Sequence, residues 1–191
     1  MSKQATRKKV AKRARPASGK LTGPRRRSTP LVGVVMGSDS DLPTMQRCLN
    51  QLEQFGIPFE VRIISAHRTP ALAHEYATTA LDRGLKVIIA AAGMSAALGG
   101  MLAACTSLPV IGVPMAAGPL GGIDAALTKM QMPPGIPVGC MAIGPAGATN
   151  AGIFAAQILA LSDKKLAGKL ERFKKTQAAK VIARDRQLQR R

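Results

Sequence analysis

The chain has 191 residues, of which 46% are hydrophobic, and this size suits one ordinary domain whose core needs no disulfide or metal. Aromatic residues make up only 3% and Trp is absent. This argues against a protein that binds single-stranded nucleic acid by stacking aromatic side chains on its bases. The formal net charge of +18 is concentrated at the two ends, because residues 31–163 contain only 6 basic against 8 acidic residues.

Residues 1–30 contain 11 Lys and Arg, no acidic residue and no apolar periodicity. Such a segment cannot bury enough apolar surface to offset its ordering entropy, so we expect a disordered basic tail. Contact with nucleic acid through phosphate groups is the alternative interpretation, and a solvated tail is favoured over it. The tail has no apolar run typical of a secretory signal. The three cysteines, Cys48, Cys105 and Cys140, form no CxxC pair, which argues against a disulfide framework or a zinc site and fits a reducing compartment. We therefore expect a cytoplasmic protein that does not span a membrane.

From residue 31 onward, short apolar runs alternate with helix-length segments. Strands are predicted at residues 31–36, 59–64, 86–92, 109–114 and 138–143. Helices are predicted at residues 42–55 and 70–83, from Gly93 to about Ser107, at 123–130, and up to about Leu161. Five strand–helix repeats of this kind predict an α/β fold with a parallel sheet covered on both faces, and the apolar runs predict fully buried strands.

A last helix is predicted to begin at Ser162 or Asp163, which suit an N-cap. Its apolar side consists of Leu166, Leu170, Phe173 and Val181. Such an amphipathic helix needs a surface to cover, and we expect docking on its own domain or on a neighbouring subunit rather than on a membrane. The predicted organisation is a basic tail (1–30), a catalytic domain (31–162) and a C-terminal helix (163–191).

Polar residues follow the first three predicted strands, at the sheet edge where parallel α/β proteins bind their ligands. The loop 37–41 has the sequence GSDSD and leads into a helix, so its N–H groups and the Ser38 hydroxyl can bind an anion. The Asp41 carboxylate would repel phosphate and is expected to accept hydrogen bonds from sugar hydroxyls. In the loop 65–70, Arg68 offers a planar pair of donors to phosphate. Together these loops predict a pocket for a ribose phosphate.

His67 is the side chain in these loops that titrates near neutral pH, which suits a general acid or base. Most of its neighbours in the SAHRTP loop are not core residues, so a packed core histidine is disfavoured. His74 lies inside the next predicted helix and is interpreted as an incidental surface or packing residue. The sequence contains no HxH, HxxxE or clustered carboxylates, so we predict no catalytic metal.

Six segments support a resemblance to a known family. They are VVMGSDSD (34–41), ISAHRTP (64–70), VIIAAAG (87–93), LPVIGVP (108–114), MQMPPGIPVG (130–139) and AIGPAGATNAGIFAAQILA (142–160). In order and spacing they closely resemble the N5-carboxyaminoimidazole ribonucleotide mutases of purine biosynthesis, over about residues 31–175. The resemblance implies a three-layer flavodoxin-like α/β/α domain, a homo-octamer with exchanged C-terminal helices, and an isomerase that moves a carboxyl group from nitrogen to C4 of an imidazole.

The resemblance also implies roles for individual residues. Ser38, Asp41 and Arg68 would bind the ribonucleotide substrate, and His67 would be the general acid and base. The remaining pocket residues would be Ser65, Ala92 and Gly93. The reaction would need no metal, ATP or other cofactor. The expected partners are the small ribonucleotide, further copies of the chain and, functionally, the synthase that makes the substrate.

One segment departs from the mutase pattern. Where the bacterial mutases have a loop with AGGAAHLPG, this chain has residues 92–100, so that Ala97 stands at the position of the histidine and Gly99 at that of the proline. This loop partly resembles the related carboxylases that use free CO2, but those have Lys where Arg68 stands. The mutase is therefore favoured, and the CO2-dependent carboxylase is the alternative. Two further alternatives are a nicotinic acid nucleotide carboxylase, against which the SAHRTP loop argues, and a basic nucleic-acid-binding protein.

Overall fold

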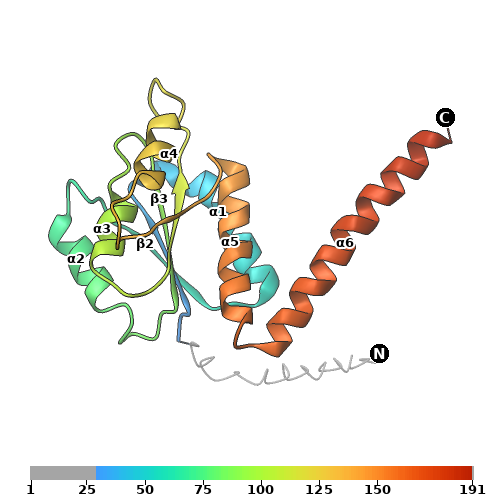
Figure 1. The fold of residues 1–191 in the computed structure, drawn as a ribbon, viewed down its shortest axis with the longest axis horizontal. Helices are drawn as coiled ribbons and strands as arrows, with labels where there is room; N and C mark the ends of the chain where they lie inside the picture. Colours follow the sequence, from blue (N-terminus) through green and yellow to red (C-terminus); the bar gives the residue numbers. More distant parts are fainter. Residues whose placement is uncertain (1–28, 191) are drawn as a thin grey trace, which may run out of the picture.

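The computed structural model describes residues 29–190 and has a parallel five-stranded sheet with helices on both faces (Figure 1). The strand order is β2-β1-β3-β4-β5. The strands are β1 (Val32–Met36), β2 (Phe59–Ile63), β3 (Val87–Ala92), β4 (Val110–Pro114) and β5 (Gly139–Cys140). This architecture confirms the predicted three-layer α/β fold. Most of the predicted tail, residues 1–28, lies outside the described residues.

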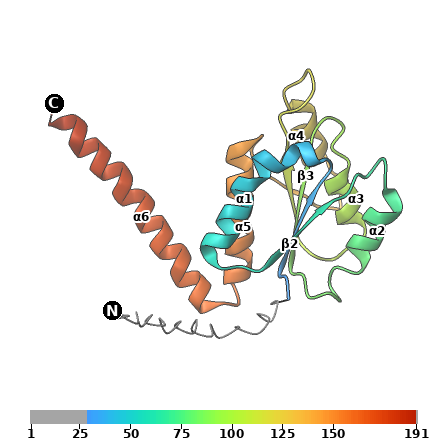
Figure 2. The same cartoon turned by 180° about the vertical axis from the view of Figure 1, so that it is seen from behind.

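The helices divide between the two faces of the sheet. They are a short 3-10 turn η1 (Asp39–Asp41), α1 (Leu42–Phe55), α2 (Pro70–Thr78), α3 (Leu98–Ala104), α4 (Ile123–Met130), α5 (Pro145–Ala160) and α6 (Lys164–Gln189). Helices α1 and α5 cover one face, and α2 and α3 cover the other, as the views from front and back both show (Figures 1 and 2).

Strand β1 contributes side chains to the hydrophobic cores on both faces of the sheet. All five of its residues are buried. Val32, Val34 and Met36 pack in the core on the α1 and α5 side, whereas Val35 packs in the core on the α2 and α3 side. Because successive side chains of a strand point to opposite faces, a central parallel strand must be apolar throughout. Strands β3 and β4 are buried in the same way.

The prediction of fully buried strands is wrong for β5, in which Gly139 is exposed and Cys140 half-buried, and for β2. This strand lies at the edge of the sheet, where only β1 pairs with it, and its last three residues are exposed. An edge strand borders solvent along one side, so it tolerates Glu60 and Arg62. Glu60 forms an ion pair with Arg83, whose guanidinium also lies over the Tyr76 ring at 4.5 Å.

Several predicted elements are shorter in the structure. Helix α2 ends at Thr78 instead of residue 83, because the chain from Thr79 to Gly84 forms turns. Helix α3 ends at Ala104 instead of about Ser107, and β5 keeps two residues of the six predicted. Local composition does not show where tertiary contacts replace a helix by turns, and these boundaries are therefore the weakest part of the prediction.

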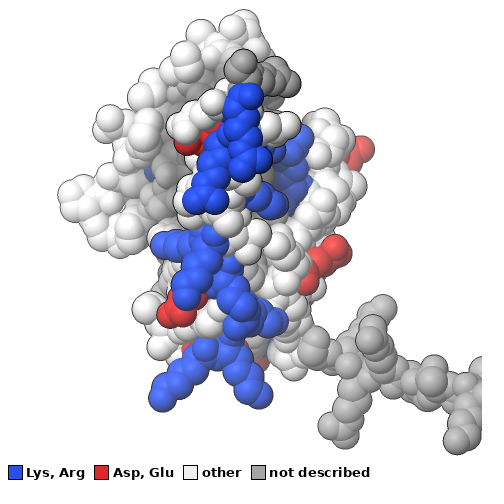
Figure 3. Space-filling model, turned by 90° about the vertical axis from the view of Figure 1, so that its right-hand side faces the viewer, with Lys and Arg blue, Asp and Glu red and all other residues white. Residues whose placement is uncertain are grey.

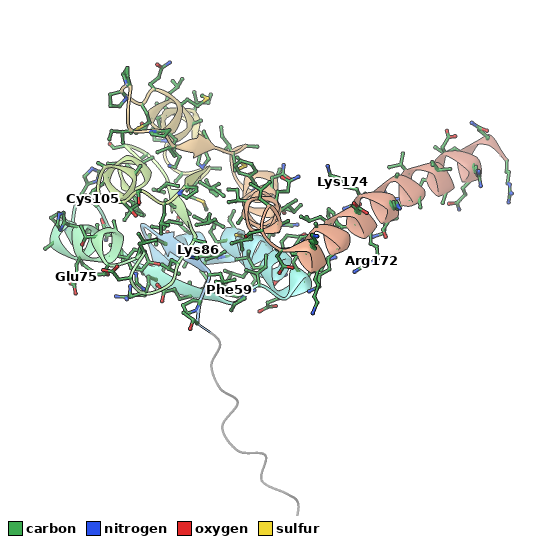
Figure 4. The ribbon with its side chains drawn as sticks, turned by 60° about the horizontal axis from the view of Figure 1, so that its bottom comes forward. Phe59, Glu75, Lys86, Cys105, Arg172 and Lys174 are labelled. Carbon is green, nitrogen blue, oxygen red and sulfur yellow. The ribbon has the colours of Figure 1, made fainter. Side chains whose placement is uncertain are left out.

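Helix α6 begins as predicted and then leaves the domain. The Asp163 carboxylate caps it by accepting hydrogen bonds from the N–H groups of Lys165 and Leu166, at 2.9 and 3.1 Å. Leu166 is buried against the core, but Val181, expected on the same apolar side, is 67% exposed. The outer part of α6, beyond Arg172 and Lys174, extends away from the sheet and its helices (Figure 4). Within residues 29–190, no helix is both long and apolar enough to cross a membrane.

Candidate active site

A cavity of about 470 Å³ lies at the carboxyl edge of the sheet, between the loops that follow β1, β2 and β3. All seven residues proposed from the sequence line it, namely Ser38, Asp41, Ser65, His67, Arg68, Ala92 and Gly93. The carboxyl ends of parallel strands meet at one edge, which is why loops far apart in the sequence converge here.

The first loop is organised by its own polar groups. The Ser38 hydroxyl accepts a hydrogen bond from the Ser40 N–H at 3.3 Å, and the Asp41 carboxylate accepts one from the Ser38 N–H at 3.2 Å. This reciprocal arrangement is a capping box at the start of the helical segment. Asp41 is only 8% exposed, and burial raises the pKa of its carboxyl, opposed by the Ser38 N–H and the charge of Lys129. The loop therefore presents a carboxylate that is fixed in direction and partly shielded from water.

The second loop is a tight turn held by Ser65 and Thr69. The Thr69 hydroxyl donates to the Ser65 carbonyl at 2.9 Å and accepts from the Ser65 N–H at 3.0 Å. The Ser65 hydroxyl accepts from the Arg68 N–H at 3.2 Å. Between these anchors His67 is exposed on the cavity wall. The turn fixes the backbone and leaves the imidazole accessible to a ligand.

Arg68 connects the second loop to the first. Its Nη2 donates to the Gly37 carbonyl at 3.1 Å, and its Nε donates to the Ser65 hydroxyl at 3.4 Å. The remaining N–H groups of this guanidinium are available at an exposed position on the cavity wall. Arg68 is thus held in place on one side and can offer donors to an anion on the other.

The third loop has an unusual backbone. Met94 and Ala96 have φ angles of 56° and 40°, in the left-handed region that residues with a side chain rarely adopt. Strain of this kind costs on the order of 1–3 kcal/mol per residue and is typical of functional sites. The small residues Ala92, Gly93 and Ala97 leave room for the cavity on this side.

The site therefore combines an arginine with available N–H groups, a fixed carboxylate, an exposed imidazole and a wall of small apolar residues. Such a set can bind a phosphorylated sugar and transfer a proton. Across residues 29–190, no group of three or more His, Cys, Asp and Glu side chains is placed to hold a metal ion. His74 lies exposed on α2 and is not among the residues that line the cavity, in agreement with its interpretation as a surface residue.

One buried residue near the site was not predicted from the sequence. Lys129 of α4 is 1% exposed, and its Nζ donates to the carbonyl of Ala92 at 2.9 Å, just behind the cavity wall. The apolar periodicity of the helix places Ile123, Leu127 and Met130 on one side and favours that side as the buried one. In the structure these three are 60%, 48% and 56% exposed. The sequence carries no local signal for Lys129, because its burial depends on which side of α4 faces the sheet, where Ala125 is buried as well.

The comparisons with known proteins agree with this geometry. A family model described as AIR carboxylase matches residues 31–180. The chain belongs to the AIR carboxylase family. A protein of Vibrio parahaemolyticus named N5-carboxyaminoimidazole ribonucleotide mutase is 53% identical over 152 residues, which are 80% of this chain and 94% of that protein. The protein of the same name from Bacillus subtilis is 50% identical over 159 residues, or 83% and 98% of the two chains.

A solved structure shares the architecture of this chain. The crystal structure of Treponema denticola PurE matches with a TM-score of 0.72 at 32% identity, covering 83% of this chain and 98% of that one. The family match starts at Leu31, one residue before β1, and ends inside α6. It thus includes the whole sheet and the three loops that line the cavity. The resemblance noted in the sequence is confirmed at the level of the family and the fold.

Proposed function

We propose that the protein is an isomerase of purine biosynthesis that converts N5-carboxyaminoimidazole ribonucleotide into 4-carboxy-5-aminoimidazole ribonucleotide. The observation that supports this most is the convergence of the GSDSD and SAHRTP loops on one cavity, with His67 exposed beside Arg68. Identity of 50–53% to proteins named for this reaction supports the same function.

The binding roles follow from the charges around the cavity. Arg68, held by Gly37 and Ser65, would bind the phosphate of the substrate with its free N–H groups, and Ser38 would add a hydroxyl. Asp41 would accept hydrogen bonds from the ribose hydroxyls, since its carboxylate is fixed by the Ser38 N–H. These contacts would place the imidazole ring of the substrate between His67 and the third loop.

The chemistry requires one proton carrier. The bond between nitrogen and the carboxyl carbon breaks with its electron pair left on nitrogen, which takes a proton from the His67 imidazolium as CO2 is released. C4 of the ring then attacks the CO2, and the C4 proton passes to the neutral His67. The imidazole thus ends in its starting state. The wall formed by Ala92, Gly93 and Ala97 would keep the CO2 beside C4 until it reacts.

A substrate assay tests this proposal against the alternative carboxylase. The protein is given N5-carboxyaminoimidazole ribonucleotide in one reaction, and aminoimidazole ribonucleotide with bicarbonate in the other. Fast formation of the 4-carboxy product only from the first substrate is the expected result. Faster turnover of the second pair would instead favour the carboxylase that uses free CO2.

His67→Asn tests the proton carrier. Loss of the imidazole is expected to lower kcat by about 10²–10⁴, the usual contribution of a general acid and base, while substrate binding persists. His74→Asn is the matched control, because it makes the same change at an exposed histidine of α2. A His67→Asn variant as active as the control would remove the proposed acid and base.

We further propose that the protein forms a homo-octamer in which α6 packs on a neighbouring subunit. Support comes from apolar side chains that a single chain leaves exposed on and beside α4, namely Leu120, Ile123, Leu127 and Met130. The proposal places the enzyme in the cytoplasm. It also couples the enzyme functionally to the synthase that attaches the carboxyl group to nitrogen, since that reaction must supply the substrate.

A further inference from the structure

The buried side chain of Lys129 crosses strand β4 to reach the cavity wall from behind. Its stem lies over Gly112, where an added Cβ would stand 2.7 Å from Cδ of the lysine. Gly112 is therefore the residue that leaves room for this path. At its end, Nζ donates to the Ala92 carbonyl at 2.9 Å. Residues 31–163 contain only two lysines, and the other, Lys86, is exposed.

No carboxylate pairs with this ammonium. Among residues 29–190 the one ion pair within 4.0 Å joins Arg83 and Glu60. The ionisable groups that act on Lys129 are Cys140 of β5, Asp41 of the first loop and Asp124 of α4. Burial lowers the pKa of Lys129 to about 8, and these three groups oppose that shift. An unpaired buried cation is costly, so its place behind a ligand cavity calls for a functional reason.

The direction of one peptide group links Lys129 to the cavity. The Ala91 carbonyl accepts from the Gly37 N–H at 2.9 Å, on the β1 side, whereas the Ala92 carbonyl accepts from the Met115 N–H at 3.1 Å, on the β4 side. In a trans peptide the N–H points opposite to the C=O. The Gly93 N–H is therefore directed toward β1, where Gly37 belongs to the cavity wall.

We propose that Lys129 is a positioning residue for the carboxyl transfer, acting through the Ala92–Gly93 peptide. The ammonium pulls on the Ala92 carbonyl and so polarises the Gly93 N–H, which donates a hydrogen bond to the migrating carboxyl group. Hydrogen-bonded groups polarise one another in this way inside a protein. The interaction strengthens as negative charge develops on the CO2 oxygens during attack by C4, so it accelerates the reaction more than it tightens substrate binding. This inference rests on the proposed function for its substrate, but not for its peptide geometry.

The first test measures the peptide itself and needs no substrate. Labelling with [13C-carbonyl]alanine and [15N]glycine selects the Ala-Gly peptides of the chain, of which there are five, at Gly93, Gly118, Gly147, Gly152 and Gly168. The Gly93 amide signal is expected to shift with a midpoint near pH 8 in the wild type and to lose this titration in Lys129→Met. The other four signals are internal references. Lys86→Met, which makes the same change at an exposed lysine (Figure 4), should leave the Gly93 titration intact.

The second test measures turnover. Lys129→Met is expected to lower kcat about tenfold with KM changed less than about twofold, because the polarised N–H acts on developing charge. The kcat/KM of the wild type should fall above about pH 8 and that of Lys129→Met should not. The Met variant should fold, since replacing a buried charge by an apolar side chain of similar volume is often neutral or stabilising. Lys129→Gln, which is also uncharged, provides a second variant.

Each result decides the inference. A Gly93 signal that does not titrate in the wild type, or that titrates equally in Lys129→Met, overturns it whatever the substrate assays give. The inference is also overturned if the kcat of Lys129→Met lies within about twofold of the wild-type value, or if kcat/KM falls above about pH 8 in both proteins. Absence of turnover in the wild type would instead contradict the proposed function, and the amide titration would still decide whether Lys129 polarises the loop.

Discussion

At the scale of single residues, Lys129 lowers the stability of the fold while, by the inference above, it raises kcat. Its ammonium is buried and unpaired, so the folded chain binds this proton less tightly than the unfolded chain does. The folded-state pKa of about 8 lies below the ordinary value of 10.5. The cost to stability is therefore complete below about pH 8, and it disappears as the pH rises past 10.5.

The difference in stability between Lys129→Met and the wild type should follow this window. The variant is expected to be more stable by up to about 3 kcal/mol near pH 7, and the gain should vanish above pH 10.5. Urea unfolding of both proteins across this range measures the difference, in which the titrations of all other groups cancel. A gain that stays constant with pH would show that the lysine is not desolvated.

The other residues that line the cavity could be selected from the sequence because each stands in a local pattern. Ser38 and Asp41 belong to a capping box, and His67 and Arg68 lie in a short polar loop between two predicted elements. Lys129 stands in no such pattern. Its position depends on which side of α4 faces the sheet, and the apolar side of that helix faces outward.

At the scale of elements, the contact between α1 and α5 depends on a missing side chain. Gly152 of α5 faces α1 so closely that an added Cβ would lie 2.9 Å from the Cys48 carbonyl oxygen and 2.9 Å from Cβ of Gln51. Burial in the same interface raises the pKa of the Cys48 thiol to about 12. The two helices therefore form a dry, tightly packed layer on one face of the sheet.

Two glycine substitutions in helices should have opposite effects. Gly152→Ala is expected to destabilise the protein by about 1–3 kcal/mol, because the new methyl group overpacks the α1–α5 contact. Gly168→Ala in α6 meets its nearest new neighbour, Nη1 of Arg172, at 3.6 Å and should stabilise by up to about 1 kcal/mol through helix propensity. Thermal unfolding of both variants measures this. A similar shift in both would contradict the close packing.

The elements themselves were largely predictable from hydrophobic patterns, and helix α4 was placed at residues 123–130 without error. Two predictions fail for different reasons. The prediction of full burial groups β2 with the central strands, although Glu60 and Arg62 alternate with its apolar residues and such alternation indicates exposure on one face. The turns from Thr79 to Gly84 replace the last predicted turns of α2, and the local sequence does not distinguish them from helix.

At the scale of the whole molecule, α6 is the helix whose outer apolar side chains a single chain leaves exposed. Its first turns pack on the domain, where Phe173 contacts the Phe55 ring edge-on with 5.5 Å between ring centres. Farther along, Val181, Ile182 and Leu188 are 67%, 50% and 66% exposed. Lys and Arg side chains gather along the side of the molecule from which α6 projects (Figure 3). Both the apolar and the basic side chains of α6 are thus available to a neighbouring subunit.

Removal of the outer part of α6 should weaken the proposed assembly. Deletion of residues 177–191 is expected to shift the sedimenting species from the octamer toward smaller forms, because it removes the exposed apolar side chains. Deletion of residues 1–28 serves as the control, because it removes 11 basic residues, against 5 in residues 177–191, without touching α6. A 20.0 kDa monomer for the full chain at micromolar concentration would contradict the octamer.

The two edge strands of the sheet affect how readily the protein aggregates at high concentration. An open strand offers unpaired N–H and C=O groups to which a stray polypeptide can add, and this is how ordered aggregates begin. Here one border is β2, where Glu60 and Arg62 alternate with apolar residues, and the other is β5, which is two residues long. Charge deters such addition at the first border and shortness at the second, so the folded chain resists edge-to-edge association at high concentration.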